Sequence, residues 1–162
     1  MVLERPTVNL AHVLDSALVA TQPMFATAGH QIRMALPPES IEIDGDVRRL
    51  VQVFTNLLSN AAKYTPPGGH VAVEATVSDH RVAVRVRDDG LGIAPDLLPR
   101  IFEIFVQSRD SRGRTQGGLG IGLNLVRRMV ELHGGSVSAT SDGTGRGSAF
   151  VVELPLSEGP LA

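Results

Sequence analysis

The chain has no cysteine among its 162 residues, which excludes disulfides as a source of stability. A single domain of this length buries most of its apolar surface without disulfides or structural metals. The sequence also lacks an apolar run near the roughly 20 residues of a membrane span, and it shows no basic stretch followed by an apolar segment at its start. We therefore expect a single domain over residues 1–162 that is soluble, cytoplasmic and without membrane contact of its own.

An excess of charge of either sign is missing too. The net charge is −2, and 20% of the residues are charged. Because proteins that bind nucleic acid usually carry a strong basic excess, we do not expect a nucleic-acid surface. Lysine is almost absent, since 14 of the 15 basic residues are arginine. The single lysine, Lys63, lies beside the single tyrosine, Tyr64, which makes this segment a place to look for function.

Helical and extended periodicities alternate along the chain. We expect helices at 9–27 with Asn9 as the cap, from Asp44 or Asp46 to about Tyr64, and from about Gly120 to His133. Extended segments are expected at 30–36, 41–43, 136–140 and 148–156, and an antiparallel hairpin at 70–87. Helices on one face of a mixed, mostly antiparallel sheet define the α+β class, here as a two-layer α/β sandwich.

Three polar side chains share one stripe of the second predicted helix. Asn56, Asn60 and Lys63 are spaced i, i+4 and i+7. Amides in mid-helix are poor helix formers, although helix-surface asparagines without a role are equally common. Mg²⁺ prefers oxygen ligands and takes one or two from a protein, so the amide oxygen of Asn60 fits it. Lys63 would then provide a positive charge for a phosphate, and Tyr64 a wall or donor beside a base.

The segment Asp88-Asp-Gly90-Leu-Gly92 follows a predicted strand directly. A partly buried carboxylate at Asp88 would accept a hydrogen bond from the exocyclic amine of adenine, which guanine does not offer there. The glycines permit a tight turn and the close approach of a ligand. Taken alone, this pattern more often marks an ordinary turn begun by Asp88 and Asp89.

A glycine run, Gly118-Leu-Gly120-Ile-Gly122, opens the third predicted helix. Unpaired backbone N–H groups and the positive end of the helix dipole meet there without side chains in the way, which favours phosphate. The run lacks the Gly-Lys-Ser/Thr of a P-loop, and its spacing differs from the dinucleotide fingerprint.

The polar stretch before this run, Glu103–Gln116, has no helical or extended periodicity. It is either a solvated loop or a lid over a phosphate site. As a lid, it would bring Arg109, Arg112 or Arg114 to a γ-phosphate.

Together these motifs resemble the catalytic ATP-binding domain of sensor histidine kinases, in the superfamily that includes the gyrase, Hsp90 and MutL ATPases. The resemblance covers about residues 5–156. Five motifs stand in family order: the N box at Asn56–Tyr64, the G1 box at Asp88–Gly92, the F box at Arg100–Phe105, the G2 box at Gly118–Gly122 and a final glycine turn at Gly143–Phe150.

The resemblance implies a Bergerat fold that binds ATP and Mg²⁺, with Asp88 at adenine, Asn60 at the metal and a mobile lid over about 103–118. The nucleotide-binding residues it implies are Asn56, Asn60, Lys63, Tyr64, Asp88, Gly90, Gly92, Ile93, Phe105, Gly118, Leu119, Gly120, Ile121, Gly122, Leu123, Ser148 and Phe150. The catalytic residues it implies are Asn56, Lys63 and the lid arginines Arg109, Arg112 and Arg114.

Asn56 bears on the type of reaction. Hydrolysing members of the superfamily carry a glutamate at this position as the general base, whereas an amide cannot accept a proton at neutral pH. The resemblance therefore favours phosphate transfer to a histidine of a separate dimerisation domain, which in turn serves a response-regulator receiver domain. A hydrolytic ATPase and a non-catalytic nucleotide-binding module are the alternatives.

None of the five histidines lies in the His-Glu/Asp pattern of a phosphoacceptor helix: His12, His30, His70, His80 and His133. His133 ends a predicted helix, where a capping role is expected. We therefore expect a module, monomeric without its dimerisation domain, that does not phosphorylate itself. The sequence leaves open whether a parent protein is anchored in a membrane.

Overall fold

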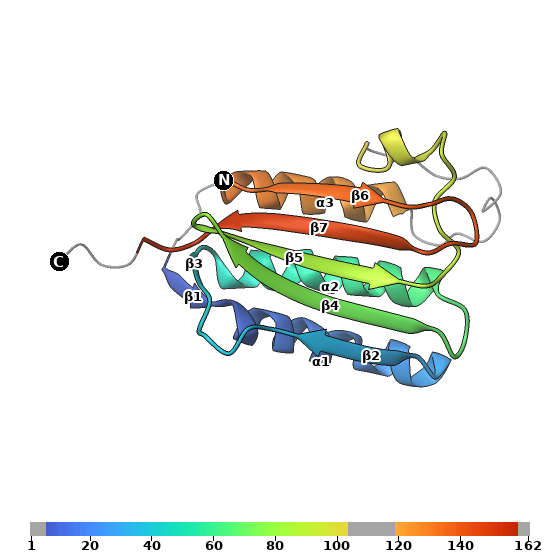
Figure 1. Cartoon of the computed structure of the whole chain (residues 1–162), viewed down its shortest axis with the longest axis horizontal. Coiled ribbons are helices and arrows are strands. Elements are labelled where there is room, and N and C mark those ends of the chain that lie inside the picture. Colours follow the sequence, from blue (N-terminus) through green and yellow to red (C-terminus); the bar gives the residue numbers. More distant parts are fainter. Residues whose placement is uncertain (1–5, 104–118, 159–162) are drawn as a thin grey trace.

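A computed structural model of the chain describes residues 6–103 and 119–158 (Figure 1). In order, its elements are β1 (Thr7–Asn9), α1 (Leu10–Ala28), β2 (Gln31–Ala35), β3 (Glu42–Asp44), α2 (Val47–Tyr64), β4 (His70–Ser78), β5 (Arg81–Asp88), the 3₁₀ turn η1 (Leu98–Arg100), α3 (Leu119–Leu132), β6 (Ser136–Thr140) and β7 (Ser148–Pro155). None of the helices in the described parts of the chain is both long and apolar enough to cross a membrane.

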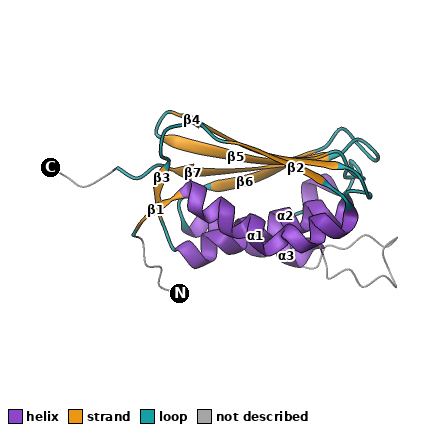
Figure 2. Ribbon diagram, turned by 90° about the horizontal axis from the view of Figure 1, so that it is seen from below, coloured by secondary structure: helices purple, strands orange, loops and turns teal. Residues whose placement is uncertain are grey.

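Five strands form one sheet in the order β2-β4-β5-β7-β6. All neighbours are antiparallel except β2 and β4, which run parallel. The three α-helices cover one face of this sheet, and no helix within residues 6–103 and 119–158 lies on the other face (Figure 2). The predicted two-layer α/β sandwich with a mixed, mostly antiparallel sheet is confirmed.

The core lies between the helices and the sheet. Alternate residues of β4 and β5 face the helices and are buried: Val71, Val73, Ala75, Val82, Val84 and Val86. Branched side chains suit a pleated surface that is half covered, which is why these segments are strands. Val77 is 47% exposed, so the buried stripe of β4 ends one position before the sequence pattern predicts.

Helix ends follow the capping chemistry of the sequence. The Asn9 side chain accepts from the N–H of Ala11 at 2.8 Å and starts α1, as predicted. Of the two candidate caps for α2, Asp46 has this role and accepts from the N–H of Arg48 at 3.1 Å. Asp44 instead ends β3, where it faces Thr7.

The strand β1 was not predicted. It has three residues and pairs antiparallel with β3 in a separate two-stranded sheet. Three residues are too few to show a period of two, and an isolated pair of such strands is not stable alone in water. The pairing depends on the packing of α1, whose Leu10 N–H donates to the Ile41 carbonyl at 2.9 Å.

His133 joins the end of α3 to the beginning of α2. It is 1% exposed, and its Nδ1 lies 2.8 Å from the carbonyl oxygen of Met129. The backbone N–H of Asp46 donates to Nε2 at 3.0 Å. Because Nε2 accepts, Nδ1 carries the proton and donates to Met129. The contact with Met129 is the capping role expected from the sequence.

We predict that His133→Leu lowers the free energy of unfolding by about 1–3 kcal/mol, because the N–H of Asp46 and the carbonyl of Met129 lose their partner. Urea titration followed by circular dichroism measures this. His12→Leu, at an exposed position of α1, is the matched control and should stay within about 0.5 kcal/mol of the wild type. Equal midpoints for the two variants would contradict the role of His133.

Candidate functional site

The predicted motifs gather at one end of the sandwich, on the right in Figure 1. The end of α2, the end of β5, the beginning of α3 and the turn before β7 all lie there. Segments that lie between Tyr64 and Ser148 in the sequence therefore meet at one edge of the molecule.

Asp88 is the last residue of β5 and faces the helices, with 7% of its surface exposed. Its Oδ1 accepts from the N–H of Gly90 at 2.9 Å, and its Oδ2 accepts from the hydroxyl of Ser148 at 2.9 Å. Ser148 is also its register partner on β7. Burial raises the pKa of Asp88, and the hydrogen bonds from Gly90 and Ser148 oppose this rise. The result is a desolvated carboxylate held in one orientation.

The turn after Asp88 packs directly on the end of α2. The N–H of Leu91 donates to the carbonyl of Tyr64 at 2.9 Å. A Cβ on Gly90 would collide with the same carbonyl oxygen, so only glycine allows this approach. Gly92 has a φ of 72°, a conformation that side chains with a Cβ rarely adopt. The glycines of the G1 box are therefore required by packing as well as by any ligand.

The final glycine turn closes over the same segment from the other side. The N–H of Gly145 donates to the carbonyl of Leu91 at 2.6 Å, and that of Gly147 donates to Gly90 at 3.0 Å. The backbone of Ile93, whose side chain is buried, donates to the hydroxyl of Ser141 at 3.0 Å. Three hydrogen bonds thus fasten the G1 box to the turn that leads into β7.

The predicted stripe on α2 is partly accessible. Asn56, Asn60 and Tyr64 are half-buried, and Lys63 is exposed. The side-chain nitrogen of Asn60 is buried with no hydrogen-bond partner among the described residues. Burial raises the pKa of Tyr64, so its phenol remains a hydrogen-bond donor at neutral pH. An unpaired buried amide nitrogen costs free energy, and Asn60 is one of five described side chains with a buried polar atom that has no hydrogen-bond partner.

On the far side of the site, two aromatic rings pack edge to face. Phe102 and Phe150 have ring centroids 6.1 Å apart at an interplanar angle of 89°. The side chain of Asn124, on α3, donates to the carbonyl of Phe102 at 3.1 Å and holds this segment against the helix. Phe150 is buried, so it forms part of the floor beside Asp88 on the sheet.

The first turn of α3 contains the end of the glycine run. A Cβ on Gly122 would meet no atom of the described residues within 4 Å, and Leu123 is buried. Leu119, Gly120 and Ile121 belong to the helix backbone. Five predicted site residues lie outside the described residues: Phe105, Arg109, Arg112, Arg114 and Gly118.

Two polar contacts at the site were not predicted from the sequence: that of Asp89 with His70 and that of Ile93 with Ser141. Asp89 accepts from the N–H of His70 at 2.8 Å and from the His70 ring at 2.8 Å, and these contacts lower the pKa of Asp89. Ser141 holds the backbone of Ile93. For Asp89, the alternation of β5 was a usable signal, because it directs Asp88 inward and Asp89 outward. No pattern marks Ser141.

Comparison with known proteins places the chain in a family. Residues 45–158 match the family described as Histidine kinase-, DNA gyrase B-, and HSP90-like ATPase. The histidine protein kinase DivJ of Caulobacter vibrioides is 37% identical over 159 residues, which are 98% of this chain and 26% of DivJ. The signal transduction histidine-protein kinase BaeS of Escherichia coli is 37% identical over 153 residues, 94% of this chain and 32% of BaeS.

Solved structures agree with this. The mycobacterial sensor histidine kinase MprB superposes with a TM-score of 0.81 at 26% identity, over 94% of this chain and 97% of that one. Full-length ShkA in complex with AMPPNP superposes with a TM-score of 0.83 at 32% identity, over 99% of this chain and 33% of ShkA. The chain belongs to the family of histidine kinase-, gyrase- and HSP90-like ATPases. Within it, the chain is a catalytic ATP-binding domain of the histidine kinase type, and it spans 26–32% of the length of DivJ and BaeS.

We predict opposite effects of one substitution at two glycines. Gly90→Ala should lower the free energy of unfolding by about 1–3 kcal/mol, because the new methyl group overlaps the Tyr64 carbonyl and the backbone must shift. Gly122→Ala should raise it by about 0.5–1 kcal/mol, because the space is open and alanine favours a helix. Thermal unfolding monitored by calorimetry compares them. Similar melting temperatures for both variants would show that the turn does not pack on α2 as described.

Proposed function

We propose that the chain binds Mg-ATP at the end of the sandwich and transfers the γ-phosphate to a histidine of a separate domain. The observation that carries the proposal is the carboxylate of Asp88, buried and oriented by Gly90 and Ser148. ShkA, which superposes over 99% of this chain, is described as a complex with AMPPNP, and this supports the same use of the site here.

Asp88 would select adenine over guanine. An ionised carboxylate only accepts hydrogen bonds, and the exocyclic amine of adenine donates one. Guanine has a carbonyl oxygen at the same place, so two acceptors would face each other without water between them. Two donors already fix the carboxylate, so it need not reorient when the base arrives.

The residues on α2 suit magnesium and phosphate. The amide oxygen of Asn60 would supply one oxygen ligand to a cation, and its side-chain nitrogen, buried without a partner among the described residues, would remain available as a donor to a phosphate oxygen. Among the described residues, no group of three or more His, Cys, Asp or Glu side chains is placed to hold a metal. A cation would therefore be held by Asn60 together with phosphate oxygens and water. When bound, Mg²⁺ neutralises charge on the phosphates, and the exposed Lys63 adds a further positive charge.

Asn56 favours transfer over hydrolysis. It lies one turn before Asn60 on α2, where the hydrolysing members of the superfamily carry the glutamate that activates water. An amide holds the position without accepting a proton, so bound ATP would persist until a nucleophile arrives. The hydrolytic alternative thus lacks its base, whereas a non-catalytic nucleotide-binding module would use the same buried acid and glycine turns and is separated from the kinase only by phosphate transfer to an acceptor histidine.

The acceptor would come from another part of the parent protein. The chain spans 26% of DivJ and 32% of BaeS, which leaves room in those kinases for other domains. Of the histidines in this chain, His133 is buried and His70 is paired with Asp89. We propose a histidine-bearing dimerisation domain as the immediate partner and a response-regulator receiver domain as the final one. The isolated chain would be monomeric.

We predict that Asp88→Asn weakens Mg-ATP binding by roughly 10- to 100-fold, the equivalent of one charged hydrogen bond.

The same substitution bears on stability. Because burial raises the pKa of Asp88, its carboxylate binds a proton more readily in the folded protein than in the unfolded chain. The charged form therefore costs stability, and this cost grows as the pH rises through the folded pKa. At pH 7 the variant should melt at the same or a higher temperature than the wild type.

Calorimetric titration and thermal unfolding together test this prediction. As the pH is lowered, the Mg-ATP affinity of the wild type should begin to fall at a pH above the usual pKa of aspartate. The reason is that the raised pKa of Asp88 lets this carboxylate become protonated at a higher pH. Asp89→Asn, at the exposed neighbouring position, is the control and should bind Mg-ATP like the wild type. Equal binding by wild type and Asp88→Asn would remove the assignment of the adenine site.

We also predict that the purified chain neither keeps labelled phosphate from γ-labelled ATP nor releases phosphate above the protein-free background. The first follows from the absence of an acceptor histidine and the second from Asn56. Asp88→Asn serves as the control for contaminating ATPase. Stable label on this chain would refute the separate acceptor, and phosphate release that Asp88→Asn abolishes would favour the hydrolytic alternative.

A further inference from the structure

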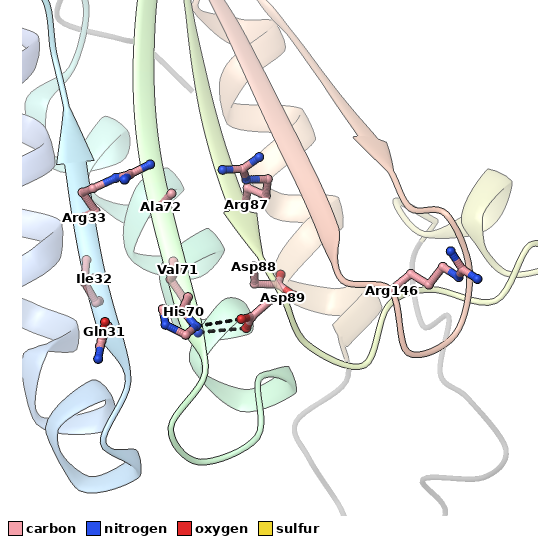
Figure 3. A pocket seen from close by; sticks show the side chains of 10 residues that line it. All are labelled: Gln31, Ile32, Arg33, His70, Val71, Ala72, Arg87, Asp88, Asp89 and Arg146. Carbon is pink, nitrogen blue, oxygen red and sulfur yellow. Dashed lines mark hydrogen bonds and ion pairs between the residues drawn. The ribbon is translucent and has the colours of Figure 1, made fainter.

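A hollow of about 650 Å³ lies on the sheet, lined by residues of β2, β4 and β5 and by Arg146 of the glycine turn. Figure 3 shows the side chains around it. Arg33, Ala72 and Arg87 point away from the helices, because the alternate residues, such as Val71 and Val86, are the ones buried against them. The hollow therefore opens on the face of the sheet that carries no helix.

Two arginines flank an alanine in exact cross-strand register. Arg33 on β2 is paired with Ala72 on β4, and Ala72 is paired with Arg87 on β5. Two strand spacings place the two arginine Cα atoms about 10 Å apart. The methyl group of Ala72 leaves the space between them free, and in Figure 3 the two guanidinium groups lie on either side of it. Both guanidinium groups can reach one group placed above Ala72.

Neither arginine has a carboxylate directly opposite it, and Glu74 is only a diagonal neighbour of both on this face. Arg87 lies between Ala72 and Ala149 in the sheet, whereas Arg85, two residues earlier on the same face, lies directly opposite Glu74. Within residues 6–103 and 119–158 no ion pair involves Arg33, Arg85 or Arg87, so Arg85 differs from the other two only in having Glu74 directly opposite it. Two positive charges across an alanine, with no acid opposite, leave a local need for negative charge.

The exposed carboxylate of the hollow does not meet this need. Asp89 lines the hollow, but each of its oxygens already accepts a hydrogen bond from His70, one from the backbone and one from the ring. In Figure 3 this pair lies at the end of the strands, beside the turn, rather than between the two arginines.

We propose that this hollow binds a phosphorylated small molecule, with a phosphate above Ala72 between Arg33 and Arg87. Guanidinium groups form paired hydrogen bonds to phosphate oxygens, and two of them match its double negative charge. The volume lies within the range of small-molecule sites. The site is on the opposite face from the side chain of Asp88, and the proposal does not depend on the proposed function.

Inorganic pyrophosphate is the probe, added to the ¹⁵N-labelled chain without magnesium while backbone amide shifts are recorded. We expect shifts at Ala72 and Arg87 that saturate together. Arg33→Gln and Arg87→Gln should each weaken binding at least tenfold, and the double variant should not bind there. The matched control is Arg85→Gln, on the same strand and face but opposite Glu74, which should bind like the wild type.

Three results would overturn the proposal. One is equal affinity in all the variants, and another is shifts confined to the nucleotide site around Gly122. The third is that this face binds a glutamate-rich peptide but does not bind pyrophosphate. The surface would then be a binding site for acidic protein segments. A Mg-ATP titration of the same samples reports separately on the proposed function, so failure of one assignment is distinguishable from failure of the other.

Discussion

One buried carboxylate sets the conditions that the rest of this end of the molecule must satisfy. Asp88 ends the central strand of the sheet, and a charge removed from water there is costly unless donors surround it. Gly90 and Ser148 supply two donors, which requires the chain to turn sharply after β5 and β7 to begin directly alongside. The close packing of Gly90 on α2 and the hydrogen bonds to the final glycine turn follow from this arrangement. The third donor would come from the base.

Local chemistry made much of the fold predictable. Asn9 and Asp46 begin helices because their side chains accept backbone N–H groups, and the valines of β4 and β5 alternate because one face of the sheet is buried. Pairing between distant segments was not predictable to the same degree. Nothing near Gln31 indicates that β2 runs parallel to a strand beginning at His70, and β1 has too few residues to show a pattern.

The candidate site also has a part that the sequence predicts and a part that only the tertiary structure shows. Its residues were identified from motifs, and the structure brings Asp88, Gly90, Gly92, Ile93 and Ser148 together as one connected turn region. The contact of His70 with Asp89 and that of Ser141 with Ile93 could not be read from the motifs, because they join residues 19 and 48 positions apart in the sequence. The pairing of Arg33, Ala72 and Arg87 likewise exists only through strand register. Sequence patterns identified groups with a chemical role, and register decided which of them meet.

The place of β7 in the sheet has a consequence for how the domain forms during synthesis. This strand is the last of the described strands in sequence order, yet it lies beside the central β5 and supplies the hydroxyl that holds Asp88. A ribosome-bound chain that has extruded only the residues up to α3 exposes one edge of β5 and has no partner for its terminal acid. The end of the domain that carries Asp88 is therefore completed only when residues 148–155 emerge, so a nascent chain fixes this carboxylate late.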